Sequence, residues 1–143
     1  MVILSVDYGD TRTGIAACDN SETLAFPVCV IKEKYQPSLI EKIKAVIAEK
    51  KPQMIVVGYP VNMDGTIGER AEKCADFARK LGEETGIETV CRDERCTTLS
   101  ASRLLGEAQV WGKKRKNVID SVAATEILQQ FLDYRRNLNG NNR

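Results

Sequence analysis

The sequence predicts an α/β fold, a mixed β-sheet flanked by helices. Three strand-like segments come first and are separated by short turns, which indicates an antiparallel start. Helical and strand-like segments then alternate, as in parallel strands joined by crossover helices. The length of 143 residues fits one domain with a proper core. We expect this domain to cover residues 1–137 and a polar, disordered tail to cover residues 138–143.

The antiparallel part of the sheet is predicted from three apolar segments. Val2–Val6 is a continuous apolar run, as in a central strand. Thr13–Cys18 follows after a short turn, which favours a hairpin. Leu24–Ile31 is the third segment. It contains Pro27, which predicts a sheet edge or an irregularity because proline has no N–H to donate.

The alternating part is predicted from helix-start signals and apolar runs. Ser38 and Thr66 are each followed three residues later by glutamate, the pattern of a capping box. The expected elements are, in order, a helix from Ser38 to about Lys50, a strand Met54–Gly58, a helix from Thr66 to Gly86, a strand Ile87–Cys91, a short helix after Thr97 or Thr98, and a last helix from Val118 to about Tyr134.

The composition excludes several classes of protein and site. The five cysteines include no C-x-x-C pair, so neither a disulfide framework nor a zinc site is expected. We expect Cys29, Cys74 and Cys91 to be small core residues in a reducing cytoplasm. No histidine is present, which excludes histidine general bases and the usual serine triads. No apolar run has the length of a membrane helix or a signal peptide, so we expect a cytoplasmic protein without membrane contact.

Carboxylates occur at three separated points where a buried or half-buried charge is costly. Asp7 ends the first strand, Asp93 and Glu94 follow a later one, and Asp120 lies in the first turn of the last helix. A carboxylate in such a place needs a cationic partner. Without histidine, a hard oxygen-binding cation is indicated, Mg²⁺ first and Mn²⁺ as the alternative. Such a cation favours phosphoryl-transfer chemistry.

Each of these acids also has a simpler interpretation. Asp7 could only start a turn, and Asp93 and Glu94 could form surface ion pairs with Arg92 and Arg95. Because side chains alternate along a strand, only one of Asp93 and Glu94 can point into the site. We prefer Glu94 as the ligand and keep Asp93 as the alternative.

Asp120 shares its helix face with small or apolar residues. Ala123, Ala124 and Ile127 lie three, four and seven positions further on, so this face packs inward. The simpler interpretation is a favourable interaction with the helix dipole, worth up to about 1 kcal/mol. Asn117 is already a candidate cap, which weakens that interpretation.

A basic segment precedes the last helix and is predicted to be a loop at the mouth of the site. The net charge of the chain is only +1, so any surface that binds nucleic acid must be local. The alternative is a solvated loop without a partner. The candidate phosphate-binding residues are Arg12, Arg95, Lys113, Lys114, Arg115 and Lys116.

Four motifs, in order along the chain, resemble the YqgF/RuvX family. They are Val-Asp-Tyr-Gly-Asp-Thr-Arg-Thr-Gly at 6–14, Val-Val-Gly-Tyr-Pro-Val-Asn-Met-Asp-Gly-Thr at 56–66, Asp-Glu-Arg-Cys-Thr-Thr at 93–98 and Asp-Ser-Val-Ala-Ala at 120–124. The resemblance extends to about Tyr134. It implies a ribonuclease H-like fold, with metal ligands at Asp7, Glu94 and Asp120 and with the Met63–Thr66 loop lining the same cleft.

The resemblance implies a metal-dependent nuclease. The substrate would be precursor 16S ribosomal RNA at its 5′ end, or a Holliday junction. We expect a monomer or a homodimer that binds structured RNA or branched DNA, and a dimer would favour symmetric junction cleavage. The alternatives are a non-cleaving nucleic-acid-binding module in ribosome assembly or transcription, and an ATPase-like nucleotide-binding domain, for which the chain lacks a second half.

Overall fold

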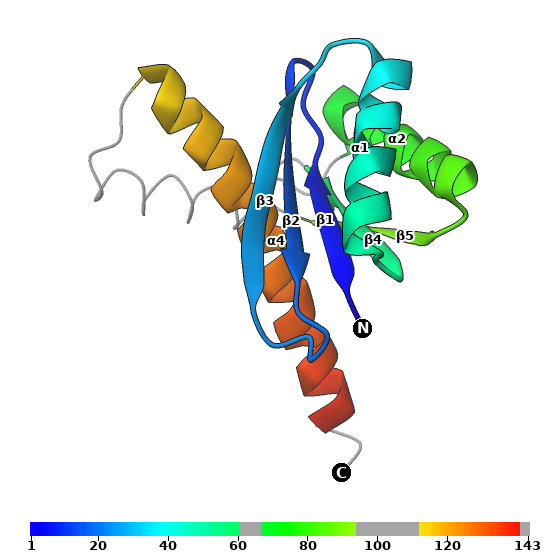
Figure 1. Ribbon diagram of the computed structural model, residues 1–143, viewed down its shortest axis with the longest axis vertical. Helices are drawn as coiled ribbons and strands as arrows, with labels where there is room; N and C mark the ends of the chain where they lie inside the picture. The colour runs from blue at the N-terminus through cyan, green and yellow to red at the C-terminus, as the bar shows by residue number, and fades with distance from the viewer. Residues whose placement is uncertain (61–66, 94–111, 141–143) are drawn as a thin grey trace.

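The structure is a computed structural model that describes residues 1–60, 67–93 and 112–140, with side chains described at 1–60, 67–93 and 122–137. The described strands form one sheet of five strands in the order β3-β2-β1-β4-β5 (Figure 1). The elements are β1 (Ile3–Asp7), β2 (Arg12–Cys18), β3 (Ala25–Lys32), α1 (Gln36–Lys50), β4 (Met54–Tyr59), α2 (Glu69–Thr85), β5 (Glu88–Asp93) and α4 (Gly112–Gly140).

The sheet is mixed, as predicted. β1 pairs with β2 and β2 with β3 in antiparallel fashion, whereas β1 with β4 and β4 with β5 are parallel. The irregularity expected at Pro27 is present on edge strand β3. Ile15 pairs with Cys29 but Ala16 pairs with Pro27, so Val28 is an extra residue in β3. An edge position and a bulge are the places where a strand tolerates proline.

Two apolar cores lie on opposite faces of the sheet. Figure 1 shows α1 and α2 on one side of the strands and α4 on the other. Leu4 and Val6 of β1 face α1 and α2, while Ile3 and Ser5 face α4. The alternation follows from the two-residue repeat of a strand. β1 is therefore central and covered on both faces, which explains why its sequence is mostly apolar and why its buried Ser5 is hydrogen-bonded.

Both capping-box predictions were wrong about where the helices begin. α1 starts at Gln36, after Tyr35 as N-cap, because Pro37 favours the first turn of a helix. Ser38 therefore lies inside that turn. α2 starts at Glu69 after Gly68, three residues beyond Thr66. Neither helix start has a side-chain cap hydrogen bond.

The last helix is longer than predicted at both ends. α4 begins at Gly112, so the basic segment expected as a loop has a helical backbone, and it continues to Gly140, into the expected tail. Lysine and arginine are good helix formers, and neither glycine nor proline interrupts the chain between the two ends. A run of positive charges was therefore not sufficient to predict a loop at Lys113–Lys116. The short helix expected after Thr97 or Thr98 lies outside the described residues.

No helix in the described parts of the chain has a stretch both long and apolar enough to cross a bilayer.

Candidate active site

Asp7 is the last residue of central strand β1 and is half-buried. Asp7 lies two residues after Ser5 and four after Ile3, so strand alternation places all three on the sheet face covered by α4. The buried Ser5 hydroxyl donates a hydrogen bond of 2.6 Å to the Ala124 carbonyl. This bond fixes α4 against β1 two residues before Asp7.

Two buried glycines flank Asp7 in the sheet. Asp7 pairs with Gly14 of β2. On the other side Val6 pairs with Val57, so Gly58 is the next residue of β4. Both glycines belong to the α4 face by the alternation of their strands. No side chain therefore stands beside the Asp7 carboxylate on either neighbouring strand, which leaves room for a ligand to approach the backbone.

Two arginines lie further out on the same face. Arg12 starts β2, and Arg92 of β5 pairs with Gly58. The guanidinium carbon of Arg92 lies 5.2 Å from the centre of the Tyr134 ring on α4. In the described part of the chain, the side-chain nitrogens that are buried without a hydrogen-bond partner are Nε of Arg12 and Nε of Arg92. A buried N–H donor without a partner is costly, and an anion would satisfy it.

Two side chains of α2 contact the turn between β1 and β2. Arg70 forms an ion pair of 3.0 Å with Asp10 and also donates to the Tyr8 carbonyl. The Tyr8 ring stacks on Phe77 of α2, with ring centres 4.1 Å apart. These contacts set the position of the turn that carries Asp7 and Arg12.

The predicted ligands are described to different extents. Asp7 lies where the sequence placed it, at the carboxyl end of a central strand. Asp120 lies on α4 one helical turn before Ala124, and its side chain is outside the described set, as are the side chains of Lys113–Lys116. Glu94 and Arg95, like the loop at Met63–Thr66, fall outside the described residues. Within the described residues no group of three acids, cysteines or histidines could hold a metal ion, so the three-carboxylate site stays a prediction.

Strand alternation assigns a sheet face to Asp93, the candidate acid that lies on β5. Thr89 lies against Gly82 of α2, whereas Arg92 contacts Tyr134 of α4. Asp93 shares the parity of Thr89 and so belongs to the α2 face. Asp7 belongs to the α4 face, so Asp93 lies on the opposite face of the sheet from Asp7.

Among the described cysteines, Cys18 and Cys29 lack the features of nucleophiles. Cys74 is buried and Cys29 is half-buried, as expected, but the expectation for Cys91 was wrong because it is exposed on edge strand β5. Burial raises the pKa of the Cys18 and Cys29 thiols. Both thiols are therefore protonated near neutral pH, and a thiol is a weaker nucleophile than a thiolate.

Comparisons with known proteins agree with this arrangement. The family model described as RuvX, Holliday junction resolvase, matches residues 1–134. The chain belongs to the RuvX family. Fold class and family were both predicted correctly from the sequence.

Relatives in this family match the chain over nearly its whole length. A protein of Desulfitobacterium hafniense is 41% identical over 143 residues, covering 100% of this chain and 99% of its own. One of Halothermothrix orenii is 44% identical over 140 residues, covering 98% and 100%. Both carry the provisional name pre-16S rRNA nuclease.

Solved structures share the fold at low sequence identity. RuvC of Thermus thermophilus in complex with a Holliday junction substrate has a TM-score of 0.61 at 13% identity, with 96% of each chain covered. The fowlpox virus resolvase with Holliday junction DNA has a TM-score of 0.58 at 11% identity, covering 94% of this chain and 98% of its own. The RuvX-family chain therefore has the ribonuclease H-like fold of resolvases.

Sequence reasoning missed part of the site. The two glycines beside Asp7 and the inward position of Arg92 depend on strand register, which apolar runs do not define. The available signal was weak: each glycine directly follows or precedes an apolar strand run, at Thr13-Gly14 and at Val57-Gly58.

Proposed function

We propose that this protein is a divalent-metal-dependent nuclease that cleaves phosphodiester bonds of precursor 16S ribosomal RNA at its 5′ end. The observation that carries the proposal is Asp7, a half-buried carboxylate between two buried glycines with an arginine beyond each, in a chain of the RuvX family. The names of relatives that are 41 to 44% identical support the RNA substrate.

The proposed metal ligands are Asp7, Glu94 and Asp120, and the metal is Mg²⁺ or Mn²⁺. Their carboxylate oxygens are the donors that these cations prefer. The glycines beside Asp7 leave the space that a cation and a phosphate need. When bound, the cation supplies Lewis-acid polarisation of the phosphodiester.

The cationic side chains bind and orient the strand. The Nε–H groups of Arg12 and Arg92 are available to donate to non-bridging phosphate oxygens on the two sides of Asp7. Holding the phosphate in one orientation lowers the barrier by positioning. Arg95 and the basic first turns of α4, Lys113–Lys116, are proposed as further phosphate contacts.

A Holliday junction is the second candidate substrate. The family description and the junction-bound structural relatives favour it. A homodimer would support paired cuts in a junction, whereas a monomer suffices for one RNA end. A cytoplasmic location accompanies either substrate.

Cleavage of matched substrates tests the proposal. Purified protein is incubated with a precursor 16S 5′ fragment and with a four-way DNA junction, in Mg²⁺, in Mn²⁺ and in EDTA. We expect metal-dependent cleavage, stronger on the RNA, and a loss of about 10²- to 10³-fold in Asp7→Asn, the range measured when one electrostatic group that stabilises a transition state is removed. Asp76→Asn is the matched control, since Asp76 is an aspartate on α2 that pairs with Arg79 and Lys80 of the same helix rather than with the turn that carries Asp7.

The same assay ranks Asp93 and Glu94 as candidate ligands. Glu94→Gln should abolish cleavage with nucleic-acid binding retained, and Asp93→Asn should cost far less. The reverse order would assign the ligand role to Asp93. Binding without cleavage of either substrate under any metal condition would leave the non-cleaving module as the function.

A further inference from the structure

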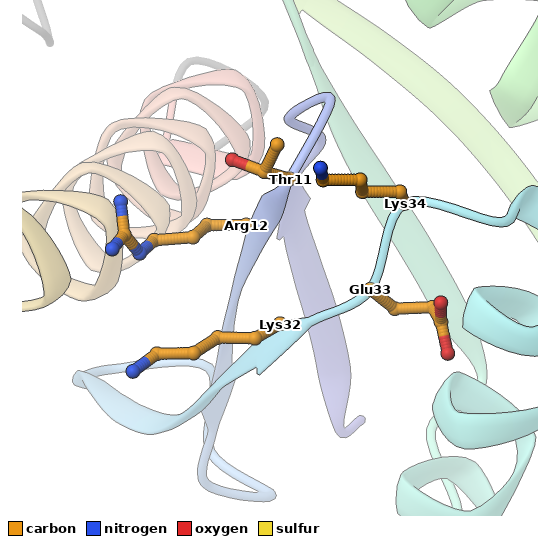
Figure 2. Close-up of a pocket in the computed structure, with 5 residues that line it drawn as sticks. All are labelled: Thr11, Arg12, Lys32, Glu33 and Lys34. Carbon is orange, nitrogen blue, oxygen red and sulfur yellow. The ribbon is translucent and has the colours of Figure 1, made fainter.

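A cationic pocket opens beside the Asp7 site, where β2 begins and β3 ends. It has a volume of about 400 Å³ and is lined by Thr11, Arg12, Lys32, Glu33 and Lys34 (Figure 2). Arg12 and Lys32 are direct partners across the two strands. The Glu33 N–H donates to the Thr11 carbonyl at 3.1 Å, so the two segments stay joined beyond the sheet.

The single carboxylate of the pocket is already neutralised. Glu33 accepts hydrogen bonds from the Lys42 ammonium at 3.0 Å and from the Tyr35 N–H at 3.2 Å. These contacts, with Lys42 first, lower the pKa of Glu33, so it is ionised and paired at neutral pH. Figure 2 shows its carboxylate pointing toward α1, away from the three cations.

The three cations of the pocket have no such compensation. Among the described residues, no carboxylate pairs with Arg12, Lys32 or Lys34. Like charges directly opposite on paired strands destabilise a sheet. The buried Nε of Arg12 also lacks a hydrogen-bond partner. An anion in the pocket would relieve both costs.

The distance between the pocket and Asp7 indicates that the anion is a phosphate of a bound nucleic acid. Arg12 lies two residues along β2 from Gly14, the partner of Asp7, and Lys32 is one strand further. With ordinary strand spacings, the backbones of these two residues lie roughly 8 to 12 Å from that of Asp7. A nucleic-acid strand whose scissile phosphate lies at Asp7 would place a neighbouring phosphate within reach of the pocket.

We propose that this pocket is a phosphate-binding subsite that holds a non-scissile backbone phosphate of the bound strand, through Arg12, Lys32 and Lys34. The proposal rests on the proposed function, because nucleic acid is the substrate there. It adds Lys32 and Lys34 to the residues that bind the strand. With Arg92 on the β5 side, it directs the strand across the carboxyl end of β1, from β3 toward β5.

Salt dependence of binding tests the subsite without any cleavage. Binding of labelled precursor 16S RNA and of a four-way junction is measured in EDTA across a salt series, in the Asp7→Asn background. Lys32→Gln with Lys34→Gln should weaken RNA binding at low salt and reduce the slope of log affinity against log salt by about 0.7, since the subsite holds one phosphate and each phosphate contact on a single strand contributes about 0.7. Lys32→Arg with Lys34→Arg should keep the slope.

The matched control removes two positive charges elsewhere. Lys50→Gln with Lys73→Gln changes lysines on α1 and α2 that lie outside the pocket. The slope of this control should stay within error of the parent, and melting curves should show that both double variants fold. An equal loss of slope in the two double variants would mean a general charge effect and overturn the subsite, as would an unchanged slope in the pocket variant.

Failure of the nuclease proposal is separable from failure of the subsite. If the wild type cleaves neither substrate but the pocket variant alone loses salt dependence, the subsite stands and the nuclease assignment fails. If the protein cleaves RNA while the pocket variant binds like the parent, the subsite is wrong and the nuclease stands.

Discussion

Gly9 sets the distance between Asp7 and Arg12. The turn from β1 to β2 passes so close to itself that a Cβ at position 9 would lie 2.0 Å from the Arg12 carbonyl oxygen. The Gly9 N–H donates to the Thr13 hydroxyl at 3.4 Å across this turn. A side chain here must force the two strands apart, and the residue that ends β1 would then move relative to the residue that starts β2.

Gly9→Ala should therefore lower stability and binding together. We expect a loss of about 2 to 3 kcal/mol in the free energy of unfolding, the upper part of the usual range for a single substitution. Urea denaturation measures it. Gly82→Ala is the control: its new methyl would meet the Thr89 hydroxyl at 3.2 Å, and alanine favours the helix, so a change of at most about 1 kcal/mol is expected. Similar losses in both variants would contradict the close approach at Gly9.

At the residue scale, the role of Asp7 could be predicted from the sequence, but the roles of its neighbours in the sheet could not. A carboxylate at the end of an apolar run is unusual in sequence alone. The roles of Gly14, Gly58 and Arg92 follow from which residues pair across strands. Strand pairing joins segments that are far apart in the sequence, so the apolar pattern within one segment does not predict it.

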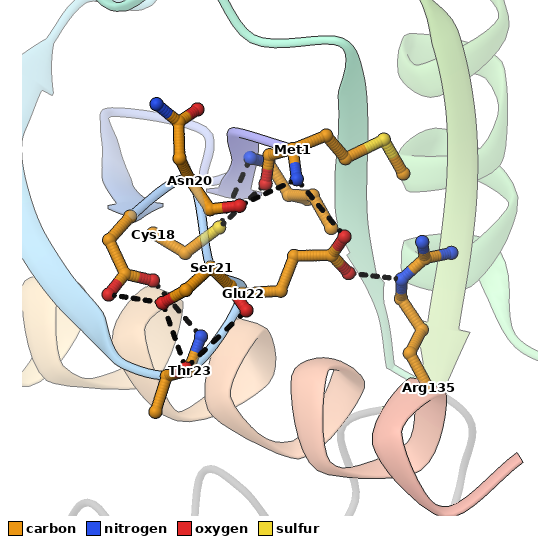
Figure 3. Close-up of polar contacts among 9 residues, drawn as sticks. Met1, Cys18, Asn20, Ser21, Glu22, Thr23 and Arg135 are labelled. Atoms are coloured by element: carbon orange, nitrogen blue, oxygen red, sulfur yellow. Dashed lines mark hydrogen bonds and ion pairs between the residues drawn. The ribbon is translucent and has the colours of Figure 1, made fainter. Parts of the chain in front are cut away.

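At the scale of elements, the carboxyl half of α4 is fastened to the β2–β3 hairpin. Glu22, in the hairpin turn, accepts hydrogen bonds from Arg135 Nε at 2.7 Å and from the Met1 amine at 3.1 Å (Figure 3). Gln129 accepts from the Ala25 N–H at 2.9 Å. The helix that carries Asp120 is thus held at the far end from the site.

Glu22→Gln should destabilise the protein in a pH-dependent manner. Chiefly through the hydrogen bond from Arg135, and also through the Met1 amine, the pKa of Glu22 is lowered in the folded protein. Its contribution is present above the unfolded-state pKa of about 4.3 and is lost as pH falls through the lower folded-state pKa. We expect a deficit of about 1 kcal/mol at neutral pH that shrinks in acid.

Urea denaturation at neutral pH and at about pH 3, well below the usual glutamate pKa, measures this difference. Glu41→Gln is the control because its partner Lys44 also pairs with Glu84 and its side chain is 70% exposed. A deficit in Glu22→Gln that does not change with pH would contradict the ion-pair explanation.

Element types were easier to predict from sequence than element ends. The strands matched their apolar runs to within one or two residues. The predicted helix starts were wrong where two local sequence signals favoured different starting residues. Pro37 outweighed the capping pattern at Ser38, and helix propensity outweighed charge in the Lys113–Lys116 segment. The ends of a helix depend on such small free-energy differences. The type of an element depends on its apolar face, which the packing of the whole core stabilises.

At the scale of the whole molecule, metal binding should stabilise the fold. Three carboxylates gathered at one end of the sheet would repel one another without a cation. A ligand at 100 times its Kd stabilises by about 2.7 kcal/mol, which corresponds to a rise in Tm of roughly 5 to 10 °C in a protein of this size. Thermal melts with and without millimolar Mg²⁺ or Mn²⁺ measure it.

Asp7→Asn should lose most of that gain, and the control Asp76→Asn should keep it. Unchanged melting curves for the wild type at saturating metal would show that the three carboxylates do not form a metal site. A gain that survives in Asp7→Asn would move the cation elsewhere.

The order β3-β2-β1-β4-β5 has a consequence for synthesis on the ribosome. The core facing α1 and α2 can close once α2 has emerged, because all its buried members precede residue 88. The opposite core needs Ala124, Ile127, Leu128 and Leu132 of α4. Until that last helix leaves the ribosome, the α4 face of the finished sheet is an exposed apolar surface, and the nascent chain is then most exposed to aggregation. Completion of the fold and completion of the candidate active site thus coincide, since the helix that covers this face also carries Asp120.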